Sequence, residues 1–273
     1  MPYFQSSDDV RLHYTDEGEG LPVLALSGLT RNGRDFDYVA PHLKGVRLIR
    51  LDYRGRGKSD WPGPETYTIP IEARDAVELL DHLKLSKAAV LGTSRGGLIA
   101  MGLGAGARDR VLGVALNDIG PDIATDGLEA IMGYLGRKPR WKTFEEATAA
   151  RAGAMKGFAN VPAERWRAEV EKLYIETPEG LDLPYDARLR DAVEAAGAQP
   201  APDLWPFFDA MAGLPLAAIR GTNSDLLTPA TFAEMQRRRP DMIAAEVPDR
   251  AHIPFLDEPE ALAALDEWLE SMR

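Results

Sequence analysis

The chain has 273 residues, 45% of which are hydrophobic, and its 43 acidic against 32 basic side chains give a net charge of −11. This length and apolar content suffice for one large α/β domain that carries an insertion, and the negative charge disfavours nucleic acid and anionic membranes as partners. The absence of cysteine excludes a thiol nucleophile, a disulfide and a thiolate metal site.

The first residues carry neither the basic nor the apolar part of a secretion signal, and no apolar stretch approaches the roughly 20 residues of a membrane span. We therefore expect a cytoplasmic protein without a membrane partner. Residues 10–14 alternate between apolar and polar side chains, which predicts the second strand of a hairpin, with His13 on its polar face.

Two unbroken apolar stretches, Leu21 to Leu26 and Val46 to Leu51, predict buried strands of the kind found in a parallel sheet that is covered on both faces. The second stretch leads into Gly57-Lys58-Ser59, which resembles the end of a phosphate-binding loop. That motif requires a glycine five residues before Gly57, where this chain has Asp52. We therefore interpret the segment as a structural turn.

A helix is predicted over residues 69–85, because apolar side chains recur there at helical spacing. The opposite face of this helix would carry Asp75, Glu78 and His82 towards solvent. The periodicity thus places His82 on the surface.

The segment from Lys87 to Gly97 predicts a strand, a tight turn and a helix, with Ser94 at the turn. The sequence around the turn, Gly92-Thr93-Ser94-Arg95-Gly96, has the form G-x-S-x-G. A serine at such a turn lies in strained backbone with its hydroxyl exposed, and residues two positions away must be small because the strand end and the helix start nearly touch. We identify Ser94 as the candidate nucleophile.

Residues 111–116 and 214–219 predict the next two strands, and the segment between them is too long for an ordinary connection. This segment contains several helical patterns, one of them behind a capping box at Thr143, and large aromatic side chains. An insertion at the carboxyl edge of a parallel sheet covers the place where such sheets bind ligands. We predict a helical cap, or lid, over residues 121–213, and a core domain made of residues 1–120 and 214–273.

A serine hydroxyl requires a base that is poised near neutral pH, and histidine is the usual one. The chain has four histidines, of which only His252 lies on a loop after a predicted sheet strand, residues 242–247. It is also the only histidine after Ser94. Loops that leave the ends of parallel strands share one edge of the sheet, so we expect His252 to reach Ser94.

The base in turn needs a carboxylate that fixes its tautomer and stabilises the imidazolium. We predict Asp225 for this role, because it follows the strand before the last one at the same edge of the sheet. Asp118 ends the strand after the nucleophile and is the alternative candidate. Asp249 is too near His252 in the sequence to reach round easily.

The tetrahedral intermediate of such a reaction requires two amide donors aimed at its oxyanion. Arg95, at the helix start, is predicted to supply one amide, and Leu29, in the loop after an early strand, the other. The side chains of Arg31 and Arg95 are candidates for binding an acidic group of the substrate. Six apolar side chains are predicted as walls of the substrate pocket: Met132, Leu135, Trp141, Phe158, Trp205 and Phe208.

With the order serine, aspartate, histidine in place, the whole chain resembles the α/β-hydrolase superfamily. The matching motifs are the G-x-S-x-G pentapeptide, the segment from Asp52 to Ser59, Asn223-Ser224-Asp225, and His252 followed by Asp257-Glu258-Pro259-Glu260. The resemblance implies an α/β fold with a mostly parallel eight-stranded sheet, helices on both faces and a helical cap between the sixth and seventh strands.

Departures from the family pattern narrow the chemistry. Serine at position 94 argues against the haloalkane dehalogenase and epoxide hydrolase branches, which use aspartate there. Thr93 and Arg95 differ from the G-N-S-M-G-G sequence of many C–C bond hydrolases. Ser27 and Ala251 stand where relatives usually have histidine and glycine, and neither change removes a group that catalysis needs.

We therefore expect a serine hydrolase, without cofactor or metal, that cleaves a small, largely apolar carboxylic ester or lactone through an acyl-enzyme. Ser94 attacks, His252 relays the proton and Asp225 orients His252 in this interpretation. The alternatives are a C–C bond hydrolase or a cofactor-free perhydrolase that uses the same triad, and a small-molecule receptor without turnover. The expected partner is a small-molecule substrate, and the oligomeric state stays open.

Overall fold

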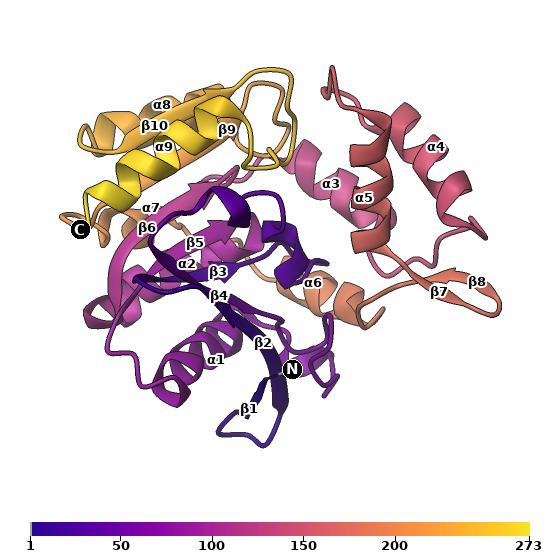
Figure 1. Cartoon of the computed structure of the whole chain (residues 1–273), viewed down its shortest axis with the longest axis horizontal. Helices are drawn as coiled ribbons and strands as arrows, with labels where there is room; N and C mark the ends of the chain where they lie inside the picture. The colour runs from indigo at the N-terminus through magenta and orange to yellow at the C-terminus, as the bar shows by residue number, and fades with distance from the viewer. Residues whose placement is uncertain (1) are drawn as a thin grey trace.

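The computed structural model describes residues 2–273, and its centre is one eight-stranded sheet (Figure 1). The strands are β1 (Tyr3–Gln5), β2 (Arg11–Glu17), β3 (Leu21–Leu26), β4 (Val46–Leu51), β5 (Ala88–Thr93), β6 (Val111–Asn117), β9 (Leu216–Gly221) and β10 (Ile243–Val247). Their order in the sheet is β1-β2-β4-β3-β5-β6-β9-β10. The pairs β1–β2 and β2–β4 are antiparallel and all other pairs are parallel, which confirms the predicted α/β fold.

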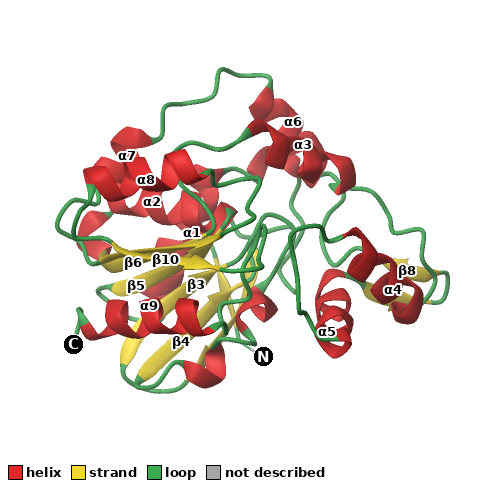
Figure 2. Cartoon of the chain, turned by 90° about the horizontal axis from the view of Figure 1, so that it is seen from above, coloured by secondary structure: helices red, strands yellow, loops and turns green. Residues whose placement is uncertain are grey.

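Helices cover both faces of the sheet (Figure 2). Successive residues of a strand point to opposite faces, so Leu24 and Leu26 enter one apolar core while Val23 and Ala25 enter the other. The first core is closed by α1 (Ile69–His82), α2 (Arg95–Gly106) and α8 (Pro229–Arg238), and the second by α9 (Pro259–Glu270). Within residues 2–273, no helix is both long and apolar enough to cross a membrane.

The chain between β6 and β9, which we call the cap segment, contains five helices and a small hairpin. In chain order these are α3 (Thr125–Tyr134), α4 (Phe144–Ala154), α5 (Ala163–Leu173), the antiparallel strands β7 (Ile175–Thr177) and β8 (Gly180–Asp182), α6 (Leu189–Gly197) and α7 (Trp205–Asp209). Thr143 caps the start of α4, because its hydroxyl accepts a hydrogen bond from the Glu146 amide at 3.2 Å. α3 to α6 lie beyond the carboxyl ends of the strands, whereas α7 packs against α2 beside the sheet (Figures 1 and 2).

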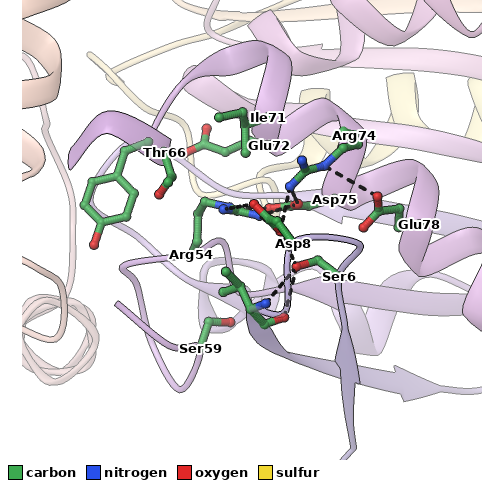
Figure 3. Close-up of polar contacts among 12 residues, drawn as sticks. Ser6, Asp8, Arg54, Ser59, Thr66, Ile71, Glu72, Arg74, Asp75 and Glu78 are labelled. Atoms are coloured by element: carbon green, nitrogen blue, oxygen red, sulfur yellow. Dashed lines mark hydrogen bonds and ion pairs between the residues drawn. The ribbon is translucent and has the colours of Figure 1, made fainter. Parts of the chain in front are cut away.

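Two polar side chains that were predicted on solvent-facing surfaces are buried. His13 in β2 is only 4% exposed, and its Nδ1 lies 2.9 Å from Asp52 Oδ2. Asp75 in α1 is fully buried, because Arg54 from the loop after β4 donates two hydrogen bonds of 2.7 Å to it. Figure 3 shows Arg54 between Asp75 and Asp8 of the β1–β2 turn. Periodicity assigned these charges to solvent because it does not detect partners that come from distant loops.

Candidate active site

Ser94 lies at a strained turn between β5 and α2. Its backbone has φ 50° and ψ −115°, a conformation that L residues rarely adopt. A Cβ atom on Gly92 would lie 2.5 Å from the carbonyl oxygen of Gly96, and one on Gly96 would lie 1.9 Å from that of Leu26. Strand and helix therefore approach too closely for any side chain at these two positions, and the turn presents the serine hydroxyl at the strand end.

The structure brings three side chains from separate loops into one hydrogen-bonded chain. Ser94 Oγ lies 3.0 Å from His252 Nε2, and His252 Nδ1 lies 2.7 Å from Asp118 Oδ2. Asp118 is fully buried, while the His252 side chain keeps 17% of its surface exposed. A carboxylate at Nδ1 holds the ring proton there, so the lone pair of Nε2 faces the serine hydroxyl. The arrangement can make Ser94 a nucleophile.

The carboxylate beside His252 is thus Asp118, which corrects the prediction of Asp225. Asp118 Oδ1 accepts a hydrogen bond from the Gly221 amide at 2.8 Å, and its Oδ2 accepts one from Ser224 Oγ at 2.6 Å. The end of β9 and the loop after it therefore supply donors that hold the carboxylate instead of supplying the carboxylate itself.

A side-chain turn at Ser224 explains why Asp225 does not reach the histidine. Ser224 Oγ accepts hydrogen bonds from the amides of Leu226 at 3.2 Å and Leu227 at 3.1 Å. This turn buries both leucines and leaves Asp225 exposed. Within residues 2–273 the Asp225 side chain makes no hydrogen bond or ion pair.

The two amides predicted to bind an oxyanion have no other acceptor in the described part of the chain. The Arg95 amide is the first of α2, where no intrahelical acceptor exists and the helix dipole favours negative charge. The Leu29 amide lies in the turn closed by the hydrogen bond from the Arg31 amide to the Gly28 carbonyl at 3.1 Å. A Cβ on Gly28 would lie 3.9 Å from Ser94 Cβ, so this turn passes beside the nucleophile.

The Arg31 and Arg95 side chains, predicted as binders of an acidic substrate group, are both bound to carboxylates of the protein. Arg95 Nε donates to Glu72 Oε2 at 2.6 Å. Arg31 donates to Glu169 at 3.0 Å and also to Asp35. Sequence reasoning missed Glu72 and Glu169. The signal available for Glu72 is its spacing of three residues from Asp75, on the face of α1 that also carries the buried Ala76 and Leu79.

Arg151 of α4 is the cation that remains unpaired near this cluster. Among the described residues its side chain makes no hydrogen bond and no ion pair, and its Nε is buried without a partner. Burial and the like charge of Arg31 lower the pKa of Arg151, while its own charge helps to lower the pKa of Glu169. Arg31, Arg151 and Lys172 thus share two carboxylates, Asp35 and Glu169, which leaves one positive charge in excess.

Most of the predicted pocket walls pack inside the protein instead. Phe208 is fully buried in the first sheet core, and Trp205 packs edge-on against it with 5.8 Å between ring centroids. Leu135 is fully buried in a cluster under α6, against which Met132 also packs. Trp141 lines an outer hollow between residues 138–142, the segment before α4, and the β7–β8 hairpin, and the triad does not contribute to this hollow. Leu29 of the predicted oxyanion hole packs against the same cluster as Leu135 and Met132, so these two side chains adjoin the site. Phe158 also lies near it, 5.7 Å from the ring of Phe255 on the His252 loop.

A cavity of about 20 Å³, the size of one water molecule, lies behind the triad and is lined by Thr93, Asn117 and Glu169 among others. No group of three or more histidine, aspartate or glutamate side chains in residues 2–273 is placed to hold a metal ion.

The sequence matches the alpha/beta hydrolase family over residues 23–265. It is 38% identical to a 3-hydroxybutyrate-oligomer hydrolase of Cupriavidus necator, over 90% of this chain and 87% of the relative. It is 29% identical to a 2-(acetamidomethylene)succinate hydrolase of Mesorhizobium japonicum, over 96% of this chain and 92% of the relative. The crystal structure of an alpha/beta hydrolase from Novosphingobium aromaticivorans superposes with a TM-score of 0.92 at 36% identity, covering 98% of this chain and 97% of that one.

Proposed function

Since the chain belongs to the alpha/beta hydrolase family, we propose that it is a serine hydrolase that cleaves the carboxylic ester of a short hydroxy acid. The observation that carries the proposal is the hydrogen-bonded chain from Ser94 through His252 to Asp118, with distances of 3.0 and 2.7 Å. The relatives are hydrolases, which favours turnover over the receptor interpretation.

The proposed reaction begins with attack of Ser94 Oγ on the ester carbonyl carbon. The serine proton passes to His252 Nε2, and Asp118 stabilises the imidazolium that forms. The amides of Leu29 and Arg95 bind the oxyanion. When the tetrahedral intermediate collapses, the bond to the alcohol oxygen breaks and His252 gives its proton to the leaving alcohol. Water then repeats these steps on the acyl-enzyme, which frees Ser94 and the acid.

The charges around the site favour a substrate that carries a free carboxylate. The stem of Arg31 and the nucleophile lie beside the same turn, because a Cβ on Gly28 would lie 3.3 Å from Arg31 Cγ and 3.9 Å from Ser94 Cβ. The unpaired Arg151 is near enough to Arg31 for that like charge to lower its pKa, and its excess charge matches a monoanion. An oligomer of 3-hydroxybutyrate, the compound in the name of the 38% identical relative, has ester bonds and one terminal carboxylate. We therefore propose this substrate class.

The test is a panel of substrates measured with wild type and Ser94→Ala. We expect wild type to hydrolyse the linear dimer of 3-hydroxybutyrate with a kcat/KM at least about tenfold above that of its methyl ester, because a hydrogen bond to a charged group contributes about 1.5–3 kcal/mol. Ser94→Ala should be inactive on both esters and should not be labelled by a fluorophosphonate probe that labels wild type. Wild type that cleaves a vinylogous diketone and no ester would instead support the C–C hydrolase alternative.

A further inference from the structure

Glu72 is a buried carboxylate that lies between two arginines. It belongs to α1 and is fully inaccessible to solvent, as is Arg56, while the Arg95 side chain is 11% exposed. Glu72 Oε1 lies 2.8 Å from Arg56 Nη1 as an ion pair, and its Oε2 accepts a hydrogen bond from Arg95 Nε at 2.6 Å. A buried cluster of charges adds little stability compared with apolar side chains of similar size. The role of this cluster is therefore to be found in the groups that its members contact.

Each arginine also contacts one half of the proposed oxyanion hole. Arg56 Nε donates a hydrogen bond to the carbonyl of Leu29 at 2.9 Å, which fixes the residue whose amide is one proposed donor. Arg95 supplies the second amide itself, and its Nη2 donates to the carbonyl of Tyr67 at 2.9 Å. In the described part of the chain no hydrogen bond joins Leu29 directly to Arg95, and Glu72 is the carboxylate that contacts both arginines. Tyr67 also lies between them, with its ring 5.3 Å from the Arg56 guanidinium.

We propose that Glu72 is a positioning residue that sets the separation of the Leu29 and Arg95 amides, so that both point at one oxyanion. This inference rests on the proposed function, because the oxyanion forms when Ser94 attacks. Donors that are held in advance stabilise the developing charge without reorganising during the reaction, and small displacements remove much of that advantage. The substrate does not need aligned donors in order to bind, so the effect belongs to kcat and not to KM.

Glu72→Gln tests the proposal, because glutamine keeps the size of the side chain and removes the charge that holds both guanidinium groups. We expect kcat on p-nitrophenyl butyrate to fall about 10- to 100-fold with KM within about threefold, somewhat less than the 10²- to 10³-fold loss that follows removal of a whole donor. Glu78→Gln is the matched control on the same helix. Its carboxylate accepts a hydrogen bond from the Ser7 amide at 2.9 Å, away from the site, so kcat should equal that of wild type.

A trifluoromethyl ketone separates positioning from a merely structural role. In the adduct a bond forms between Ser94 Oγ and the ketone carbon, the serine proton passes to His252, and the ketone oxygen becomes the oxyanion without a leaving group. Titration followed by ¹⁹F NMR gives the pKa of the hemiketal hydroxyl. We expect Glu72→Gln to raise this pKa by about one unit or more, which corresponds to at least tenfold weaker stabilisation of the oxyanion.

Arg95→Gln gives the same test if Glu72→Gln does not fold, because Arg95 is partly exposed and the variant keeps the backbone amide while it loses the contact with Glu72. The hemiketal pKa should rise in the same direction. Wild type that forms the hemiketal, with folded variants that keep its pKa and kcat unchanged, would overturn this inference alone. Wild type that forms no hemiketal would overturn the proposed function, and this inference with it.

Discussion

Replacing Asp118 by asparagine tests whether this carboxylate orients His252, because the substitution exchanges only one oxygen for an NH₂ group. Asp118 Oδ1 accepts a hydrogen bond from the Gly221 amide at 2.8 Å, and Oδ2 faces His252 Nδ1 at 2.7 Å. Because Gly221 can only donate, the asparagine keeps its oxygen at that position and turns its NH₂ group towards the histidine. The NH₂ group donates to Nδ1, so the ring proton must sit on Nε2, and His252 can no longer accept the proton of Ser94.

The expected loss is large because the histidine tautomer is wrong, and the NH₂ group also takes away the oxygen that accepts the hydrogen bond from Ser224 Oγ. The same substitution in a serine protease triad lowers kcat by about 10⁴, which is about 5.4 kcal/mol at 1.36 kcal/mol for each factor of ten. We expect a loss of about this size in kcat on p-nitrophenyl butyrate. Backbone strain does not contribute, since Asp118 has φ 54° and asparagine adopts this left-handed region as readily as aspartate.

Asp225→Asn is the matched control, because this side chain is exposed and makes no hydrogen bond within residues 2–273. Its kcat should stay within about twofold of wild type, as is usual for an exposed substitution. Thermal unfolding of both variants near the wild-type temperature would assign the difference in kcat to chemistry. The reasoning is refuted if Asp225→Asn loses activity while Asp118→Asn keeps more than about a tenth of it.

Three further predictions concern the substrate, the turn and the pH dependence. Arg151→Gln should raise KM for the 3-hydroxybutyrate dimer about tenfold and leave the neutral methyl ester unchanged, and equal effects on both would contradict a carboxylate subsite. Gly96→Ala should lower the free energy of unfolding, measured by urea titration, by about 3 kcal/mol, because its Cβ would lie 1.9 Å from the Leu26 carbonyl. Gly102→Ala is the control and should raise this free energy by about 0.5–1 kcal/mol, because no atom lies within 4 Å of its Cβ. Burial opposes ionisation of Glu169, but nearby cations outweigh it and lower its pKa from 4.5 to about 2. A carboxylate whose pKa is lowered by folding stabilises the protein above about pH 4.5, and this contribution is lost as the pH falls to about 2. The free energy of unfolding of wild type, compared with that of Glu169→Gln, should therefore be about 3 kcal/mol more favourable at pH 6 than at pH 2. A difference between the two proteins that does not change with pH would exclude the linkage.

Local patterns were sufficient to predict the sheet and the nucleophile turn. The predicted strands Leu21–Leu26 and Val46–Leu51 coincide with β3 and β4 at both ends. The requirement for small residues around Ser94 follows from a turn of five residues, and the contact distances at Gly92 and Gly96 agree with it. The strands follow from apolar runs and the Gly92–Gly96 contact from neighbours in sequence, whereas the contact of Gly96 with the Leu26 carbonyl of β3 is distant in sequence and only agrees with the same requirement.

The choice between Asp118 and Asp225 required information that local patterns lack. Both residues follow parallel strands at the same edge of the sheet, so the topology admits either of them. The outcome depends on the Ser224 hydroxyl, which caps the amides of Leu226 and Leu227 and turns Asp225 outward. A sequence motif that contains both Ser224 and Asp225 does not show which of the two faces the histidine.

The buried charges of α1 escaped prediction for a related reason. Glu72 and Asp75 lie three residues apart on one face of the helix, where hydropathy alone indicates solvent. Their partners Arg56 and Arg54 come from the loop after β4, and each pair forms only when that loop packs on the helix. Arginines at alternate positions of the loop, together with acidic residues three positions apart in the helix, indicate such pairs. Apolar periodicity alone does not detect this pattern.

The polar contact between α5 and the core gives the proposed substrate a further consequence. Glu169 of α5 is bound to Arg31 at 3.0 Å, and the carbonyl of Glu171 accepts a hydrogen bond from Arg34 at 2.8 Å. Arg165 of α5 also donates to Asp257 at 3.0 Å, whereas the side chains by which α3 and α6 pack on Tyr67 are mostly apolar. A substrate carboxylate beside Arg151 competes with Glu169 for the same cations. By linkage, the free energy that such a substrate gains from these cations weakens the docking of α5, while a neutral ester leaves it unchanged. If the proposed substrate binds beside Arg151, selectivity for its charge and the part of the docking of α5 that Glu169 provides share one electrostatic cause.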